Sequence, residues 1–258
     1  MTEPIVIGRA ERLRRLIGQP FAHRGLHGLR NDGKWLVENS LAAFEEAVAA
    51  GHGIELDVQE TADGTALVFH DDALDRLTCQ QGMVRLMTMV DLGAVELAGA
   101  GQMLQPLDAV LRHIGETAHV LVEIKSRERS PERLCQSVLD AIAGCETRIA
   151  IMSFNPEVGH WFALNAPEVL RGLIVSEADE MTLTSRIAGK IKRLFSLARS
   201  KPDFLAYDIA SLPSPLPARL RSAGIPVLTW TVRTKEDLAR AKANADQIIH
   251  ELPRPLWP

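Results

Sequence analysis

The chain has 258 residues, of which 46% are hydrophobic and 24% are charged, as in an ordinary globular domain. Its 29 Lys and Arg against 33 Asp and Glu leave a formal charge of -4, without the basic excess that nucleic-acid binding requires. We therefore expect no nucleic-acid partner. The N-terminal stretch has arginines among its apolar residues, so neither a secretory signal nor a transmembrane segment is predicted, and we expect a cytoplasmic protein.

The order of the predicted elements is that of an α/β protein. Short runs rich in Val and Ile alternate with stretches of helical periodicity, which is typical of a parallel sheet covered by helices. Strands are predicted at 20–23, 54–58, 66–70, 119–124, 149–153, 170–175, 204–208, 226–230 and 247–250. A (β/α)8 TIM barrel takes about 250 residues, so we predict a single barrel domain over 1–258 with one strand to spare.

Two helices have clear start signals. Ser40 is placed to cap a helix over 40–50, in which Leu41, Phe44 and Val48 recur on one face. A second helix is predicted over 132–143, with Ser130 as the cap and Pro131 at the first helical position.

Two stretches break the alternation of strands and helices. Residues 71–104 contain no clear strand and form a candidate active-site loop or insertion. The second stretch, 186–201, has an apolar helical face and six bases without an acid: Arg186, Lys190, Lys192, Arg193, Arg199 and Lys201. We favour a solvated outer helix here over a surface that contacts anionic head groups, so peripheral membrane contact is the less favoured interpretation.

The three cysteines do not indicate a metal or disulfide site. Cys79, Cys135 and Cys145 match neither a disulfide framework nor a paired zinc motif, so we interpret them as reduced thiols.

Three carboxylates are predicted to converge where strands end, which is where a parallel barrel builds its active site. Glu55 and Asp57 are two apart in one strand and share a face, and Glu123 occupies the next strand with Lys125 two residues later. Carboxylates brought together repel one another unless a cation neutralises them, and all-oxygen ligands favour Mg2+ or Ca2+ over zinc. The alternative is that these acids form ion pairs with nearby Arg or Lys.

Two histidines at strand ends are candidates for proton transfer. His23 and His70 each follow an apolar run and precede a charged residue, and imidazole titrates near neutral pH. Arg24 and Lys125 add two positive charges that suit an anionic phosphoryl group. The chain contains no GxxxxGK[ST], GxGxxG or GxSxG motif, which argues against nucleotide-binding enzymes and serine hydrolases.

The combined motifs resemble the glycerophosphodiester phosphodiesterase family of the phosphatidylinositol-phospholipase-C-like barrel superfamily. The matching segments are AHRG at 22–25, ENS at 38–40, GIELDVQETADG at 53–64, LVFHDDALDRLT at 67–78, VEIK at 122–125, SFNPE at 153–157 and LTWTV at 228–232. The resemblance implies metal-dependent hydrolysis of a glycerophosphodiester to sn-glycerol 3-phosphate and an alcohol.

The resemblance also implies a role for each matching residue. His23 and His70 would be the general acid and base, and Glu55, Asp57 and Glu123 would hold the divalent cation. Phosphate would be bound by Arg24 and Lys125. Glu38 and Asn39 would support the site, and the stretch after His70 would cover the glycerol end of the substrate. Trp230 either lines the pocket or belongs to the core.

Two other activities and one departure from the family remain open. A phosphodiesterase acting on lipids, like lysophospholipase D or sphingomyelinase D, and a non-catalytic glycerophosphodiester-binding protein are the alternatives. In the last strand, Gln247, His250 and Glu251 replace the family's usual glycine, threonine and aspartate. We expect this departure to affect substrate fit rather than activity. The head group and the oligomeric state are left open.

Overall fold

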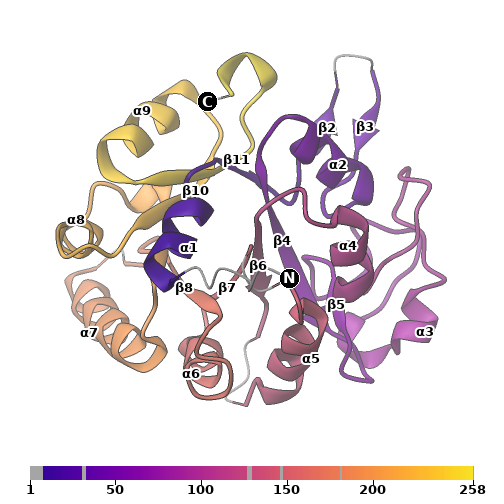
Figure 1. The fold of residues 1–258 in the computed structure, drawn as a ribbon, viewed down its shortest axis with the longest axis horizontal. Coiled ribbons are helices and arrows are strands. Elements are labelled where there is room, and N and C mark those ends of the chain that lie inside the picture. The colour runs from indigo at the N-terminus through magenta and orange to yellow at the C-terminus, as the bar shows by residue number, and fades with distance from the viewer. Residues whose placement is uncertain (1–7, 31–32, 127–129, 146–147, 181, 258) are drawn as a thin grey trace, which may run out of the picture.

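Eight parallel strands close into a barrel with helices around the outside (Figure 1). The computed structural model describes residues 8–30, 33–126, 130–145, 148–180 and 182–257. The barrel closes because β1 pairs with β4 on one side and with β11, the last strand of the chain, on the other. The predicted (β/α)8 TIM barrel is therefore confirmed.

The barrel strands, in order around the barrel, are β1 (Phe21–His23), β4 (Gly53–Glu60), β6 (Val120–Ile124), β7 (Ile149–Ser153), β8 (Leu170–Val175), β9 (Phe204–Asp208), β10 (Val227–Val232) and β11 (Gln247–His250). The helices are α1 (Arg9–Leu16), α2 (Leu41–Ala49), α3 (Met89–Leu92), α4 (Leu107–Ile114), α5 (Glu132–Ile142), α6 (Pro156–Asn165), α7 (Leu183–Ser200), α8 (Pro215–Ser222) and α9 (Lys235–Asn244).

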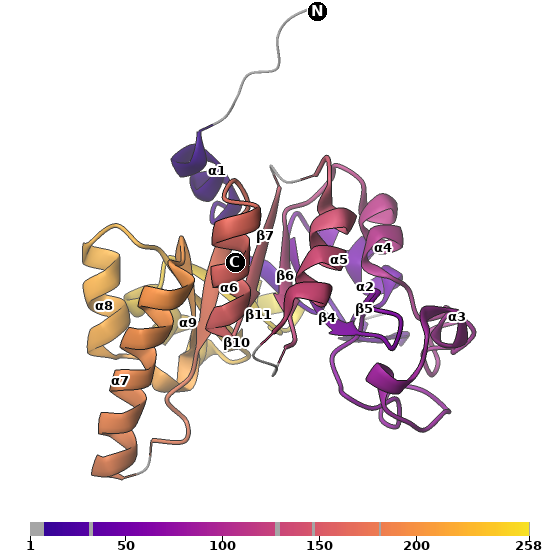
Figure 2. The ribbon, with the colours of Figure 1, turned by 90° about the horizontal axis from the view of Figure 1, so that it is seen from below.

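The interior of the barrel is filled by side chains, and α1 closes its amino end. Phe21, Leu121, Phe204 and Leu228 pack together inside the ring, with Leu16 of α1 in the same cluster. Figure 2 shows α1 at one end of the barrel, with α7 extending past the opposite end. The site must therefore lie at the carboxyl ends of the strands.

The predicted strand at 66–70 is not part of the barrel. It forms β5 (Ala66–Val68), which runs antiparallel to β4 with Val68 opposite Val58 and Ala66 opposite Glu60. The pairing of β4 with its barrel neighbour β6 ends at Val58, so the last residues of β4 extend past the barrel and support a hairpin. This hairpin returns the chain to the level of Asp57, whose carbonyl accepts a hydrogen bond from Phe69 at 3.1 Å.

Residues 71–104 form a compact insertion rather than a bare loop. They contain α3, a 3-10 turn (Val84–Leu86) and a small core in which Leu74, Val84 and Leu92 are buried. A second short hairpin, β2 (Gly28–Leu29) with β3 (Trp35–Leu36), follows β1 and was not predicted, because two-residue strands carry no periodicity.

The helix start signals are confirmed at one position and displaced at the other. Ser40 accepts a hydrogen bond from the Ala43 N–H at 3.2 Å, as expected of an N-cap. In α5 the N-cap is Pro131 rather than Ser130, and no side chain caps the helix.

The basic stretch forms most of α7, and this helix presents its apolar face to solvent. Ile187, Ile191 and Leu194 are exposed, whereas Ser196 and Ser200 are buried against the protein. Two of the bases are neutralised locally, since Arg193 pairs with Glu180 and Arg199 pairs with Glu157. Among the described helices, none is both long enough and apolar enough to cross a membrane.

Candidate active site

A cleft of about 1000 Å³ opens at the carboxyl end of the barrel. Its lining includes His70, Asp71, Glu123, Lys125 and Phe154. These residues come from the β4–β5 hairpin and from the ends of β6 and β7. The cleft therefore lies where the sequence predicted a site.

The three predicted metal ligands converge beneath this cleft. One carboxylate oxygen from each of Glu55, Asp57 and Glu123 lies within 4.8 Å of the others. All three side chains are buried, because they point inward from adjacent strands of the barrel. The predicted cluster is therefore present.

Two cations compensate part of this charge. The Lys125 Nζ lies 2.9 Å from an Asp57 oxygen and 2.6 Å from a Glu123 oxygen. The Arg24 Nε lies 3.2 Å from the other Asp57 oxygen. The ion pairs expected as an alternative to a metal site thus exist, but three carboxylates face only two cations here.

The remaining imbalance is visible in the pKa values of the acids. Burial and the neighbouring charges of Asp57 and Glu123 raise the pKa of Glu55 well above its usual range. Burial and the charge of Asp57 raise the pKa of Glu123 to about 7. Burial also acts to raise the pKa of Asp57, but Lys125 and Arg24 outweigh it and hold the pKa below its usual value.

These residues fit a hard divalent cation. The Oε1 atom of Glu55 is buried and has no hydrogen-bond partner among the described residues, which is costly unless a further group binds it. The donor set is all carboxylate, which Mg2+ and Ca2+ prefer. Glu55, Asp57 and Glu123 would therefore hold the ion.

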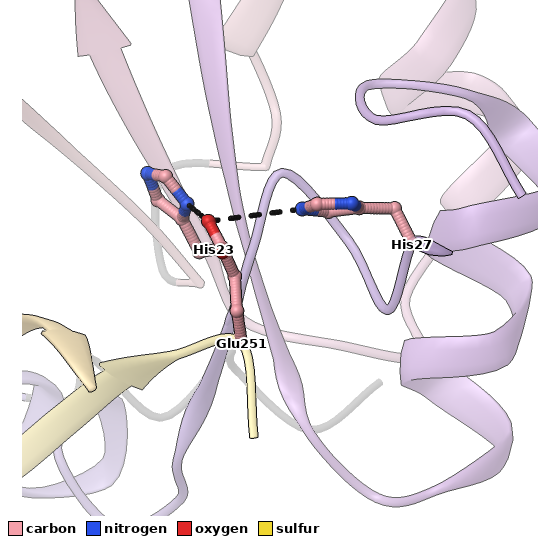
Figure 3. A group of neighbouring side chains, drawn as sticks. All are labelled: His23, His27 and Glu251. Atoms are coloured by element: carbon pink, nitrogen blue, oxygen red, sulfur yellow. Dashed lines mark hydrogen bonds and ion pairs between the residues drawn. The ribbon is translucent and has the colours of Figure 1, made fainter. Parts of the chain in front are cut away.

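His23 is held by a carboxylate from the other end of the chain. Its Nδ1 lies 2.5 Å from Oε1 of Glu251, the residue that follows β11. In Figure 3 Glu251 lies between His23 and His27, whose Nε2 is 3.8 Å from the same oxygen. Arg233 also donates to Glu251, at 2.7 Å. The Nε2 of His23 faces the carboxylate cluster, 3.9 Å from Glu55.

The pKa values of His23 and Glu251 are both lowered in this arrangement. Burial lowers the pKa of His23, although the hydrogen bond to Glu251 opposes the shift. Burial acts to raise the pKa of Glu251, but the hydrogen bonds with His23 and Arg233 and the nearby His27 ring hold it well below its usual value. Glu251 is therefore ionised and fixes the orientation of the His23 ring.

His70 is held in the same way by its neighbour in the chain. Its Nδ1 lies 2.6 Å from Oδ1 of Asp71, which in turn accepts hydrogen bonds from Arg76 at 2.6 and 2.9 Å. Arg76 also donates two bonds of 2.8 Å to Glu38. The predicted support residue Glu38 thus connects His70 to Arg24, which donates to Glu38 at 2.7 Å.

Arg24 and Asn39 reach the site through left-handed backbone. Both have φ of +56°, which non-glycine residues rarely adopt. Asn39 Nδ2 donates to Asp57 at 3.0 Å, and the Arg24 N–H donates to Glu55 at 3.0 Å. The next residue must be a glycine, Gly25, because a Cβ at this position would lie only 2.8 Å from the backbone of Ala43.

Trp230 is the predicted site residue that stands apart from the charged cluster. Its indole N–H donates to the Ala206 carbonyl at 3.0 Å, and its ring packs edge-on against Phe154 with centroids 5.6 Å apart. Since Phe154 lines the cleft, Trp230 supports the wall from the barrel interior.

Glu251, Asp71 and Arg76 were not among the predicted site residues. The signal for Glu251 was present, because it is a carboxylate directly after the last strand of a parallel barrel. Asp71 is adjacent to His70, but Arg76 lies within the insertion, where no periodicity indicated its position.

Comparisons with known proteins identify the family of the chain. A model of the glycerophosphoryl diester phosphodiesterase family matches residues 23–251. The chain belongs to this family. A glycerophosphodiester phosphodiesterase of Caldanaerobacter subterraneus subsp. tengcongensis is 30% identical over 92% of this chain and 95% of its own.

Solved structures share the family barrel. A glycerophosphodiester phosphodiesterase structure from Parabacteroides distasonis has a TM-score of 0.72 at 21% identity, covering 92% of this chain and 94% of that one. A phosphodiesterase from Oleispira antarctica, solved with the product sn-glycerol-3-phosphate, has a TM-score of 0.74 at 21% identity, covering 92% of this chain and 94% of that one.

Proposed function

We propose that the protein hydrolyses glycerophosphodiesters to sn-glycerol 3-phosphate and an alcohol, with His23 and His70 as the acid and base. The observation that carries the proposal is that the two histidine rings are held in the same way, each by its own carboxylate. Each binds a carboxylate through Nδ1, at 2.5 Å for His23 and 2.6 Å for His70. Family membership and the product bound in the Oleispira relative support the substrate class.

The Nδ1 bonds suit both directions of proton transfer. In a neutral ring, an Nδ1–H donated to the carboxylate leaves Nε2 as a base, and in a charged ring Nε2 carries the proton to be given away. One histidine would deprotonate the nucleophile, either water or the glycerol 2-hydroxyl; attack by the hydroxyl would give a cyclic phosphate that water then opens to sn-glycerol 3-phosphate. The other would protonate the departing alcohol. Each such transfer contributes about 10²- to 10⁴-fold in rate.

The charged cluster would bind the phosphodiester between the histidines. Arg24 presents a planar guanidinium and Lys125 a point charge, and both already lie against Asp57. When bound by Glu55, Asp57 and Glu123, a Mg2+ or Ca2+ ion would supply charge neutralisation of the phosphoryl oxygens. Glu38 and Asn39 would keep Arg24 and Asp57 in place through the hydrogen bonds described above.

The test is release of sn-glycerol 3-phosphate from glycerophosphocholine, measured with Mg2+, with Ca2+ and with EDTA. We expect metal-dependent release that falls at least about 10²-fold in His23→Ala and in His70→Ala. His113→Ala is the matched control, because His113 also pairs with a carboxylate, Glu45 at 2.7 Å, but lies on α4 outside the site.

Three outcomes would contradict the proposal. Near-normal rates in either histidine variant would exclude the acid and base assignment. Tight binding of glycerophosphocholine without turnover under any metal would favour a binding protein. Turnover of lysophospholipids but not of glycerophosphocholine would favour the lipid phosphodiesterase.

A further inference from the structure

The helix α7 packs with its apolar face toward solvent and a more polar face toward the protein, the reverse of the usual arrangement. Ser196 and Ser200 point into the protein, and Gly159 of α6 approaches so closely that an added Cβ would lie 2.6 Å from the Ser200 Cβ. These two serines and Leu197, which packs against the core, make contact with the rest of the protein. The other large apolar residues of the helix remain on the outer side.

A continuous apolar stripe covers that outer side. Five large side chains recur at helical spacing and are 53% to 76% exposed: Leu183, Ile187, Ile191, Leu194 and Phe195. On a helix with 3.6 residues per turn these positions fall within one face about 120° wide. Such a stripe is normally buried against another apolar surface.

Basic side chains border the stripe on both sides. Lys190 and Arg186 lie along one border and Lys192 along the other, since successive residues are rotated by about 100°. No described residue forms an ion pair with any of these three. The sequence from 181 to 202 contains no acid, so the outer side of α7 is apolar in its middle and positive at its edges.

The length of α7 places this surface beside the mouth of the barrel. The helix has 18 residues and is about 27 Å long, whereas the six residues of β8 span about 20 Å. Ser200 lies at the amino end of the barrel, next to the start of β9, so the first turns of α7 must project beyond the carboxyl ends of the strands. Figure 2 shows this overhang on the side opposite α1.

We propose that α7 is an interfacial helix that docks the protein on an anionic lipid bilayer. An apolar stripe bordered by Lys and Arg is the composition of helices that lie in the membrane interface, with the bases on the lipid phosphates. A second copy of the chain is a poorer occupant, because two such faces would bring bases together without an acid between them. Docking through the overhanging turns would place the mouth of the barrel at the membrane.

The test is cosedimentation with vesicles of phosphatidylglycerol and phosphatidylcholine, compared with vesicles of phosphatidylcholine alone. We expect the full chain to bind the anionic vesicles at least about tenfold more tightly, with binding that weakens as salt is raised. The variant Ile187→Glu/Ile191→Glu should lose this binding. Lys190→Gln/Lys192→Gln should weaken it and reduce its dependence on salt.

The matched control is Leu164→Glu, which places the same charge at a leucine that is 69% exposed near the end of α6. It should bind as the unmodified chain does. All the altered side chains are exposed, so thermal unfolding and turnover of water-soluble glycerophosphocholine should be unchanged in every variant. Vesicle binding is thereby tested separately from the proposed hydrolysis.

The proposal is overturned if the chain stays in the supernatant with both kinds of vesicle. It is also overturned if Ile187→Glu/Ile191→Glu binds normally, or if Leu164→Glu loses binding to the same extent. A dimer in gel filtration that Ile187→Glu/Ile191→Glu converts to a monomer would assign the face to a second copy instead.

Discussion

At the scale of single residues, the two candidate catalytic rings differ mainly in where their carboxylate partners come from. Asp71 is the next residue after His70, whereas Glu251 is 228 residues away from His23. The sequence motifs therefore identified both histidines but only part of what holds them. The sequence predicts that Glu251 affects substrate fit, whereas its contact with His23 indicates a positioning role.

Replacing Glu251 tests this positioning role. In Glu251→Gln an amide replaces the ionised acceptor at Nδ1, so His23 loses its preferred tautomer and kcat should fall at least about tenfold while KM changes little. Steady-state kinetics on glycerophosphocholine would measure both. His27→Gln is the control, because His27 contacts the same carboxylate from 3.8 Å. Equal losses in both variants, or none in either, would exclude the role.

A second residue-scale prediction concerns His250, which is completely buried. Burial, and to a smaller extent the charge of the nearby His52, lowers the pKa of His250 from an ordinary value of 6.5 to about 3. Between these values the unfolded chain binds a proton that the folded protein does not, so the free energy of unfolding falls as the pH falls below 6.5. One such histidine accounts for about 2 kcal/mol between pH 7 and pH 5.

Denaturant unfolding at pH 7 and pH 5 would measure this loss. In His250→Gln the loss between the two pH values should be smaller by about 2 kcal/mol than in the unmodified chain. The control His113→Gln, which replaces an exposed histidine, should show the same loss of stability between pH 7 and pH 5 as the unmodified chain. An unchanged loss in His250→Gln would contradict the assignment.

At the scale of elements, the β4–β5 hairpin explains how His70 reaches the site. The periodicity of 66–70 correctly indicated a strand, but a single strand's pattern carries no information about the direction of its partner. The end of β4 extends past β6 and leaves backbone N–H and C=O groups free to pair. The chain turns back at this point, so β5 pairs with β4 in the antiparallel direction. The reversed mounting of α7 escaped prediction for a similar reason, since helical periodicity defines an apolar face without saying what covers it.

The contact between α6 and α7 gives an element-scale prediction. Gly159→Ala should lower the free energy of unfolding by about 1–3 kcal/mol, because its Cβ would overlap Ser200. Chemical denaturation of a double-mutant cycle would measure the coupling. In the Ser200→Gly background the cost should shrink, since the colliding Cβ is gone. An equal cost in both backgrounds would place the effect elsewhere.

At the scale of the whole molecule, the unbalanced acids predict that a bound metal ion would stabilise the fold. Mg2+ or Ca2+ at about 100 times its dissociation constant should stabilise the fold by about 2.7 kcal/mol, which raises Tm by roughly 5–10 °C at this size. Thermal unfolding with and without EDTA would measure the shift.

The variant Glu55→Gln separates the stability that comes from metal binding from the stability of the metal-free fold. Removing one buried negative charge should leave the metal-free protein at least as stable, because Asp57 and Glu123 no longer repel that group. The metal-dependent rise in Tm should vanish. Glu60→Gln, on the same strand but paired with Arg133, should keep it. A retained rise in Glu55→Gln would exclude this carboxylate as a ligand.

The fold as a whole was more predictable than the site. Eight buried apolar runs determined the eight barrel strands, because a strand covered on both faces must be continuously apolar. The cluster of three carboxylates followed from the two-residue spacing within β4 and the position of Glu123 on the neighbouring strand β6. Residues such as Glu251 and Arg76 depend on which loops meet in space, and only the closed barrel brings them to the histidines.

Closure of the barrel between β1 and β11 also sets a time for assembly during synthesis. His23 is made early, but its partner Glu251 is translated 228 residues later, which takes about 10–45 s at ribosomal rates of 5–20 residues per second. From the synthesis of Glu123 until Glu251 follows 128 residues later, a nascent chain carries the AHRG motif and all three carboxylates of the cluster without the contact that orients His23. The His23 ring should therefore be held in its orientation only once the final strand has joined the barrel.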